Sequence, residues 1–562
     1  RYVQDKVWKL EKPRQRNQEK GKGKGRQSFQ GTRMEEVPLM FSAVKAMFYV
    51  ALKAFYNTVE VSGRDKLPKP GQCSIICPNH GNSLCDAIVV VSQTPRMVQL
   101  TAKDSLWSHP FFSIFVKGTG TLPIQRRAEH GSSADNTSSF SKIYEALGEG
   151  RCVAMFPEGI SRYQSGIAKL KRGIGLIALE VLKRKSEAGE DFTVNICSCA
   201  ITYLHREKFR SDVGVTYDIA IQLTTDNYKK LIDECRDEQG AAAKIMDDVG
   251  EQLRKNAISA LDWETLAAGD MARRIYAPVG TRISLHQTVS LTQGFVKVLS
   301  QMSEAQAQSL QNGVRTASDP DLKALLAAKR VTNNEAKELD ELKQQLLAYS
   351  QGLQRIGLPD HRITLEANVF SLCIRAVIRS FHCLLLLCLA VPGTILLAPL
   401  LLAGKVLEWR LQSHNQTERD IRNMDEVVTQ YKLGAMVCFG PILALLGSWL
   451  MTCYGISPWR APVLALLWLW MTVRWLEDGI ASARSLTCLF RLLLHPNKVK
   501  AMKLQREALV PKVASLADRY GLPEVGQLIR EAPSIYREPS KLKYFSLKRR
   551  RKREWGEVLR SG

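Results

Sequence analysis

The chain has 562 residues, enough for a sizeable core and at least one further structural unit, because domains usually span roughly 100–200 residues. Its 79 Lys and Arg residues against 55 Asp and Glu residues give a formal charge of +24, which favours an anionic partner such as nucleic acid, phospholipid headgroups or phosphorylated substrates. The 13 cysteines follow no repeated CxxC pattern, so we expect neither a disulfide framework nor a structural zinc site.

The N-terminal part divides into a basic segment and an apolar one. Residues 1–36 are basic and rich in Gly and Gln without the apolar core of a signal peptide, so we expect a disordered segment. The first residue is Arg1 rather than Met, which leaves the natural start open. Residues 37–61 mix apolar and aromatic side chains with only three charged ones. They predict a helix that lies on or dips into a membrane, with an ordinary core helix as the alternative.

Short apolar runs then alternate with helical stretches across residues 62–222. Strands interleaved with helices predict an α/β domain with a mixed sheet flanked by helices. Residues 223–369 are rich in Ala, Leu, Lys, Glu and Gln with helical spacing, and predict a helical extension. The runs expected to be strands are 74–78, 87–92, 97–101, 121–124, 152–156, 194–203 and 213–221.

Long apolar stretches follow within residues 370–485. Residues 381–404 contain no Asp, Glu, Lys or Arg and are long enough to cross about 30 Å of hydrocarbon as a helix. Prolines and a glycine inside this stretch keep a re-entrant hairpin open as the alternative. Residues 433–456 form a second uncharged stretch, and residues 461–476 a shorter third one that contains Arg474. Together they predict C-terminal transmembrane helices.

Basic residues flank the apolar stretches. The loop over residues 405–432 and the tail over residues 486–562 carry several Lys and Arg residues, which predicts that both lie in the cytosol. The densest basic tract is 548–553, and in a membrane protein it is most simply explained by contact with anionic lipid. A nucleic-acid patch or a plain solvated tail are the alternatives; no interleaved stacking aromatics support the first of them.

A histidine and a carboxylate stand where the first apolar run of the α/β region ends. His80 follows the run 73–78, and Asp86 comes six positions later. A histidine whose ring is held by a carboxylate can take a proton from an alcohol. The spacing of six does not place the two on one face of a regular helix, so they must meet across an irregular turn. The pair favours acyl transfer, although His-x5-Asp alone is a weak signal.

Two further segments carry charged residues at predicted strand ends. The apolar run that begins at Gly120 ends in Arg126, and Phe156-Pro157-Glu158-Gly159 is a strand end with a carboxylate and a glycine. Strand ends on one side of an α/β sheet cluster in space. We therefore expect one cleft to be lined by His80, Arg126, Glu158 and Arg162.

With these segments in this order the chain resembles the glycerolipid acyltransferase superfamily. The family's four blocks are a His and an Asp around a short linker, an apolar strand ending in Arg, Phe-Pro-Glu-Gly, and a final apolar strand, here 194–203. In the commonest family spacing the Asp would stand at Cys85 rather than at Asp86. Further stretches resemble the fungal-type glycerol-3-phosphate and dihydroxyacetone-phosphate acyltransferases: 204–211, 262–266, 272–276, 357–361 and 430–432.

The resemblance implies a catalytic pair. His80 would act as general base on the substrate hydroxyl, and Asp86 would orient its imidazole. The resulting alkoxide-like oxygen would attack the thioester carbonyl of acyl-CoA. The leaving group is a thiolate, whose conjugate thiol has a pKa of about 8.5, so its departure needs no obligatory protein acid.

The resemblance also implies substrate-binding residues. Arg126 resembles the family's phosphate-binding cation, a role that suits a guanidinium fork. Glu158 and Gly159 would contact polar groups of the acceptor, and Arg162 and Lys171 are further candidates for its phosphate or for the phosphates of CoA. As alternatives, Glu158 would pair with Arg126 structurally, and Lys171 would be a solvated helix residue.

The sequence thus predicts an α/β acyltransferase domain with a helical extension and C-terminal transmembrane helices. It would acylate the sn-1 hydroxyl of glycerol 3-phosphate, with dihydroxyacetone phosphate as a second acceptor, and give lysophosphatidic acid as the first step of glycerolipid synthesis. We expect acyl-CoA as co-substrate, no cofactor and no metal, membrane lipids but no nucleic acid as partners, and a multi-pass place in the endoplasmic reticulum membrane with a cytosolic active site. The alternatives are a lysophospholipid acyltransferase and a non-catalytic membrane scaffold that keeps the fold.

Overall fold

The computed structural model describes most of the chain after the basic N-terminal segment. The described residues are 38–108, 112–125, 135–161, 164–204, 211–277, 283–312, 333–364, 369–414 and 439–523. By its internal contacts the chain divides after Met34, and all described residues belong to the second unit. The tract 548–553 and the predicted phosphate-binding residues Arg126 and Arg162 lie outside the described ranges.

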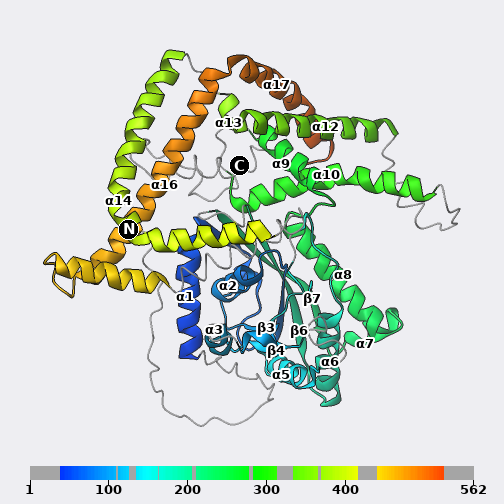
Figure 1. The fold of residues 1–562 in the computed structure, drawn as a ribbon. Helices are drawn as coiled ribbons and strands as arrows, with labels where there is room; N and C mark the ends of the chain where they lie inside the picture. Colours follow the sequence, from blue (N-terminus) through cyan, green and yellow to red (C-terminus); the bar gives the residue numbers. More distant parts are fainter. Residues whose placement is uncertain are drawn as a thin grey trace, which may run out of the picture. The chain divides into compact units, whose positions relative to one another are not determined.

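One mixed sheet is the centre of the α/β region (Figure 1). Its order over the described residues is β1-β7-β6-β2-β5-β3-β4, and every neighbouring pair is parallel except β6 and β7. The carboxyl ends of β2, β4, β5 and β6 therefore share one edge. The strands are β1 (Thr58–Ser62), β2 (Ser74–Pro78), β3 (Gln99–Lys103), β4 (Leu122–Ile124), β5 (Cys152–Ala154), β6 (Thr193–Tyr203) and β7 (Asp212–Thr224).

Helices cover both faces of the sheet, and alternating strand residues divide between two cores. Ile75 of β2 packs with residues of α5, α6 and α8, while its neighbour Ile76 packs with residues of α1 and α2. Such two-sided burial explains why the strands are apolar almost throughout. The elements around the sheet are α1 (Leu39–Phe55), η1 (Arg64–Lys66), α2 (Ser83–Gln93), η2 (Asp104–Leu106), α3 (Phe112–Gly118), α5 (Thr137–Gly148), α6 (Gly173–Glu187) and α8 (Glu238–Asn256).

The predicted membrane helix over 37–61 needs correction at its end. The helix stops at Phe55, and residues 58–62 form β1, which pairs with β7 in parallel. One face of α1 is buried in the core through Phe41, Phe48 and Leu52, as in the core-helix alternative. Leu39 at its start is 87% exposed. Membrane contact of the outer face stays a prediction.

The predicted strand over residues 87–92 is wrong, because these residues belong to α2. The run of five apolar residues 87–91, most of them buried, has neither the alternation of a strand nor the stripe of a surface helix. Val89, Val90 and Val91 are fully buried between α1 and the sheet. Periodicity alone could not distinguish the two structures here.

The region after β7 is helical, as predicted, and forms a third core. Residues of α9, α10 and α12 share this core with Val513 and its neighbours on α17. Part of the segment 486–562, which was predicted to be a basic tail, is therefore a helix whose apolar residues pack into this core. The helices are α7 (Tyr228–Glu234), α9 (Trp263–Tyr276), α10 (Leu285–Asn312), α12 (Asn333–Ile356), α13 (Asp360–Ile363) and α17 (Pro496–Arg519).

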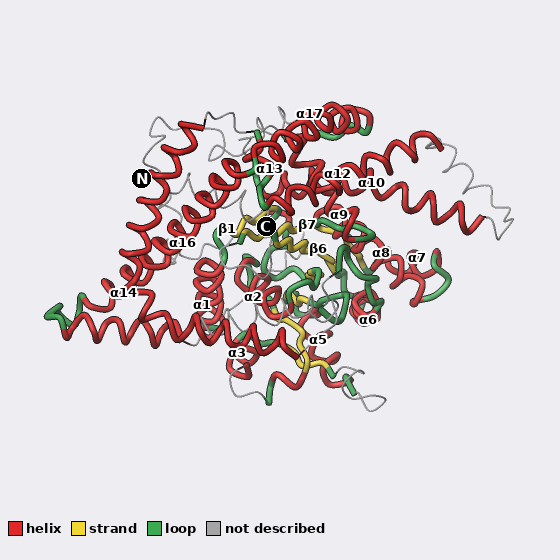
Figure 2. The backbone as a smooth tube through the Cα atoms, turned by 45° about the horizontal axis from the view of Figure 1, so that its top comes forward, coloured by secondary structure: helices red, strands yellow, loops and turns green. Residues whose placement is uncertain are grey.

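Two long helices, α14 (Val369–His414) and α16 (Ala461–Leu494), run side by side (Figure 2). Their contact uses small residues: Gly393 lies against Thr472, and Gly479 lies against Leu387. Among the described residues, one helix, Val369–Pro399, is long and apolar enough to cross a membrane by length and composition. A second apolar helix, Phe439–Cys453, is shorter. The predicted set of several transmembrane helices is therefore not confirmed.

Candidate active site

The loop after β2 positions the predicted base. Asn79 pairs with the backbone of Ile201 on β6: its Nδ2 donates to the carbonyl oxygen at 3.0 Å, and its Oδ1 accepts from the amide at 2.7 Å. The Asn79 side chain thus satisfies the N–H and the C=O of Ile201, which β2 no longer reaches because the strand ends at Pro78. His80, the next residue, is thereby fixed at the shared carboxyl edge of β2 and β6.

His80 and Asp86 are in hydrogen-bonding contact. The distance from His80 Nδ1 to Asp86 Oδ2 is 3.0 Å, His80 is 8% exposed, and Asp86 is fully buried in the first turn of α2. The backbone N–H of Asn82 donates to the same Oδ2 at 2.7 Å. The chain turns tightly at Ser83, whose φ of 41° is seldom adopted by a residue other than glycine. This turn brings together two residues that are six positions apart.

Tyr203 completes the hydrogen bonding of Asp86, and sequence reasoning missed it. Its hydroxyl donates to Asp86 Oδ1 at 2.6 Å from the last residue of β6. Burial and the neighbouring Asp86 charge raise the pKa of Tyr203 well above its ordinary value, so the phenol stays protonated. A usable signal existed, because the fourth block ends in a tyrosine at the carboxyl end of a strand.

The hydrogen bonds around Asp86 fix the state of the histidine ring. The carboxylate accepts from the Asn82 N–H and from the Tyr203 hydroxyl, two donors that favour its ionised form, and in that form it can only accept a hydrogen from Nδ1. Nδ1 therefore carries the ring hydrogen, and Nε2 keeps its lone pair. An imidazole held in this way can accept a proton from a hydroxyl group. A Cβ added at Gly81, the next residue, would meet nothing within 4 Å, so there is space on that side of the loop.

The third block contacts the histidine loop directly. The ring of Phe156 stacks on that of His80 with centroids 4.0 Å apart, and Glu158 Oε1 accepts from the His80 backbone N–H at 2.7 Å. Burial raises the pKa of Glu158, while hydrogen bonds from the backbones of His80 and Ala168 act in the opposite direction. One oxygen of Glu158 is thus used to tie two blocks together. Its contact with the acceptor stays a prediction.

Gly159 and Lys171 lie against each other. Gly159 has a φ of 75°, and a Cβ at this position would collide with the side chain of Lys171. The backbone N–H of Lys171 donates to the carbonyl oxygen of Pro157 at 2.9 Å. Lys171 precedes α6 in a loop and is exposed, so it is not a helix residue, but the alternative of a solvated side chain stays open. The structure thus brings together five predicted site residues: His80, Asp86, Glu158 and, beside Glu158, Gly159 with the side chain of Lys171 across it.

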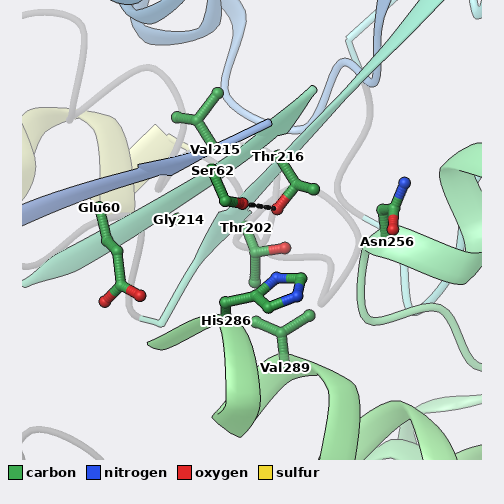
Figure 3. Close-up of a pocket in the computed structure, with 9 residues that line it drawn as sticks. All are labelled: Glu60, Ser62, Thr202, Gly214, Val215, Thr216, Asn256, His286 and Val289. Carbon is green, nitrogen blue, oxygen red and sulfur yellow. Dashed lines mark hydrogen bonds between the residues drawn. The ribbon is translucent and has the colours of Figure 1, made fainter. Parts of the chain in front are cut away.

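A separate hollow of about 240 Å³, counting solvent at its mouth, lies on the other face of β6 and β7 (Figure 3). Tyr203 reaches Asp86, and the preceding Thr202 lines this hollow, as alternation along a strand requires. Its wall includes His286 and the hydrogen-bonded pair Ser62 and Thr216, 3.1 Å apart. The hollow contains neither His80 nor Asp86. In the described ranges, no three His, Cys, Asp or Glu side chains meet as potential metal ligands.

Replacement of Tyr203 by Phe should lower turnover without changing the KM values. The variant removes one hydrogen bond to a charged group, worth about 1.5–3 kcal/mol, while Asp86 keeps its other two donors. We expect kcat to fall roughly tenfold. Steady-state kinetics of acyl transfer measure this, with Tyr228→Phe, another buried tyrosine, as the matched control. Equal losses in both variants would assign the effect to packing rather than to Asp86.

Comparison with known proteins relates this geometry to two families. Residues 58–202 match the family model described as Acyltransferase, and residues 320–525 match the Glycerol-3-phosphate acyltransferase 2 C-terminal domain. The matches confirm the resemblance to the glycerolipid acyltransferase superfamily and to its fungal-type glycerol-3-phosphate branch. The first match begins with β1 and ends within β6, so it contains the complete His80 loop and the third block.

Curated relatives come from two yeasts. An uncharacterized acyltransferase of Schizosaccharomyces pombe is 24% identical over 70% of this chain and 55% of its own length. Glycerol-3-phosphate O-acyltransferase 1 of Saccharomyces cerevisiae is 22% identical over 70% of this chain and 48% of its own length. Glycerol-3-phosphate O-acyltransferase 2 of the same yeast is 23% identical over 60% and 41%. The chain thus spans about half the length of the relatives it matches.

A solved structure is also similar. The 1-acyl-sn-glycerophosphate acyltransferase of Thermotoga maritima shares 15% identity over 38% of this chain and 78% of that chain, with a TM-score of 0.28. A similarity at this level does not establish a common function.

Proposed function

We propose, from the premise that one chain joins an acyltransferase domain to a glycerol-3-phosphate acyltransferase C-terminal domain, that the protein acylates the sn-1 hydroxyl of glycerol 3-phosphate from acyl-CoA. The product is lysophosphatidic acid. The observation that carries the chemical step is the contact between His80 and Asp86, because it leaves Nε2 as a base at a strand edge. Dihydroxyacetone phosphate is the second acceptor.

The reaction needs one proton transfer and one acyl transfer. His80 Nε2 takes the hydroxyl proton of the acceptor while the oxygen attacks the thioester carbonyl. A carbon–oxygen bond forms, the carbon–sulfur bond breaks, and CoA leaves as a thiolate that can take the proton from the imidazolium. Asp86 stabilises that imidazolium, and Tyr203 and the Asn82 backbone hold Asp86 in place. The stack of Phe156 on the ring limits its rotation.

A cation beside the site suits a phosphorylated acceptor. Lys171 lies across Gly159, beside the Glu158 side chain that contacts the His80 loop. In our proposal it contacts a phosphate of the acceptor or of CoA. Arg126, two residues after the end of β4, and Arg162 are proposed as its partners by the family resemblance.

The protein is proposed to work at the endoplasmic reticulum membrane, with its active site in the cytosol where acyl-CoA is available. The helix Val369–Pro399 supports a membrane location, since it is long and apolar enough to cross a bilayer. Its side chains Phe381 and Leu384 are 70% and 65% exposed, as suits contact with lipid. A multi-pass arrangement adds Phe439–Cys453 and the apolar first half of α16 to this helix.

The acceptor preference of the purified full chain tests the function. Acyl transfer from labelled acyl-CoA is measured with glycerol 3-phosphate, dihydroxyacetone phosphate and lysophosphatidic acid in detergent. We expect the highest kcat/KM with glycerol 3-phosphate. A preference for lysophosphatidic acid would identify a lysophospholipid acyltransferase instead. Transfer to none of the three acceptors, in protein that unfolds cooperatively, would identify a scaffold.

A further inference from the structure

A second group of cations lies far from His80 in the chain, where α9, α13 and α16 meet. Arg273 and Arg274 lie in the last turn of α9, and Arg362 lies on α13. Ile363 of α13 and Ile275 of α9 belong to the same hydrophobic core. Figure 1 shows α13 near one end of α16, and a hydrogen bond from Arg362 to Ser485 joins the two helices. Arg273 and Arg274 fall within the stretch 272–276 and Arg362 directly follows the stretch 357–361, and the proposed reaction assigns no role to either stretch.

The guanidinium groups of this cluster have few acceptors. Asp270 accepts from Arg273 Nη2 at 2.6 Å and from Arg274 Nη2 at 2.7 Å, and the ion pairs of the described residues give the cluster no other carboxylate. Arg362 Nη2 donates to the hydroxyl of Ser485 on α16 at 3.2 Å. The Nε atoms of Arg274 and Arg362 are both buried without a hydrogen-bond partner.

The nearby acid does not compensate these charges. Asp360, at the start of α13, accepts from Tyr349 at 2.6 Å and from Arg506 at 3.0 Å. His361 adds no positive charge at neutral pH, because burial and the charges of Arg362 and Arg274 lower its pKa to about 4. Arg362 is the neighbour of His361 in the chain, and Arg274 acts on the same ring electrostatically. Three guanidinium charges thus face one carboxylate.

Unpaired N–H groups and uncompensated charges in a partly buried site are costly, so an anion should occupy it. Guanidinium groups form paired hydrogen bonds with phosphate oxygens, and the Ser485 hydroxyl adds a third donor. The site is also placed near lipid, because α13 ends shortly before Val369 begins the candidate membrane helix. Ser485 follows the apolar part of the neighbouring α16.

We propose that Arg274, Arg362 and Ser485 form a binding site for a phosphate group, distinct from the site at His80. The ligand class is a phosphate monoester or diester, presented by a phospholipid headgroup at the membrane surface or by a soluble phosphate. The site links the helical region to α14 and α16, since its donors come from α9, α13 and α16. Its occupation should stabilise this junction, and the inference does not depend on the proposed reaction.

The test uses the full chain purified in a detergent without phosphate. The midpoint of thermal unfolding is measured with phosphatidic acid, with diacylglycerol as the same lipid lacking phosphate, and with inorganic phosphate. A ligand that binds the folded state raises the midpoint. We expect phosphatidic acid to raise it and diacylglycerol not to. If inorganic phosphate raises the midpoint as much as phosphatidic acid does, the ligand is a soluble phosphate. If phosphatidic acid raises the midpoint and inorganic phosphate does not, the ligand is a lipid headgroup.

Variants locate the effect. Arg274→Gln and Arg362→Gln should each weaken the apparent affinity for the effective phosphate probe by roughly tenfold to a hundredfold, as expected for loss of a charged hydrogen bond. Arg254→Gln, an exposed arginine on α8, is the matched control and should keep wild-type affinity. Ser485→Ala leaves both guanidinium groups in place and serves if either arginine variant fails to fold. The proposal is overturned if no phosphate probe moves the wild-type midpoint, if the folded site variants respond like wild type, or if Arg254→Gln loses the response equally.

Discussion

Replacement of His80 by Ala should abolish nearly all acyl transfer while leaving the fold intact. A positioned general base contributes about 10²–10⁴-fold, which corresponds to about 3–5 kcal/mol of transition-state stabilisation. The loss should appear in kcat and in kcat/KM alike, because the ring acts on the hydroxyl only as the bond forms. Asp86 keeps the donors Asn82 N and Tyr203 OH, so the buried carboxylate is not left unsatisfied. We therefore expect only a small decrease in the unfolding midpoint.

The matched control for this variant is His286→Ala. His286 is an exposed histidine on α10 that lines the hollow of Figure 3, on the sheet face away from Asp86. Its removal should leave turnover at the wild-type level. If His286→Ala lost activity and His80→Ala kept it, the chemistry would have to be moved to that hollow. If both kept it, the base would have to be sought elsewhere in the chain.

The sequence was informative where chemistry and strand ends coincide. His80 and Glu158 each follow an apolar run, and neighbouring parallel strands bring such positions to one edge of the sheet. The sequence predicted that the segments of Glu158 and His80 lie close together. It did not predict that the Glu158 carboxylate accepts from the His80 backbone N–H, because a bond from a side chain to a backbone amide leaves no pattern in the sequence.

The position of the acid shows what only the structure could supply. Cys85 stands where the commonest family spacing has Asp, and its side chain is fully buried in the core shared by α1 and α2. The left-handed turn at Ser83 rotates α2 so that Asp86 faces the histidine instead. Spacing rules assume a regular helical backbone, so they do not apply across Ser83, whose φ is 41°. Tyr203 escaped notice for a related reason, since its partner is far away in the sequence.

Two segments have structures that the sequence analysis did not predict. Residues 58–62 alternate polar residues with Val59 and Val61 and form an edge strand, whereas residues 87–91 are apolar throughout and lie in a largely buried helix. Local preference does not separate the two structures when all sides are covered. The decision is made by packing: β1 gains a ladder with β7, and α2 fills the space between α1 and the sheet. Such tertiary choices are not visible in one sequence.

Replacement of Asp86 by Asn is expected to lower kcat by roughly 10²-fold or more while the protein still folds. The amide oxygen can take the place of Oδ2 and keep the hydrogen bonds from His80 and Asn82 N, and the amide nitrogen can donate to the Tyr203 hydroxyl. The ring hydrogen then stays on Nδ1, so the variant removes the charge that stabilises the imidazolium and little else. Asp226→Asn, at an exposed aspartate, is the control.

A double variant shows whether Tyr203 acts through Asp86. If the phenol matters because it holds the carboxylate, Tyr203→Phe should change kcat by less than about twofold once Asp86 is Asn, since contacting residues in one network are not additive. An undiminished tenfold loss in the double variant would give Tyr203 a role of its own at the substrate. Asp86→Ala sets the other limit: it leaves the donors of His80, Asn82 and Tyr203 buried without an acceptor, at about 1–3 kcal/mol each. That variant should lose the fold, and the contrast with Asn separates the charge of Asp86 from its place in the structure.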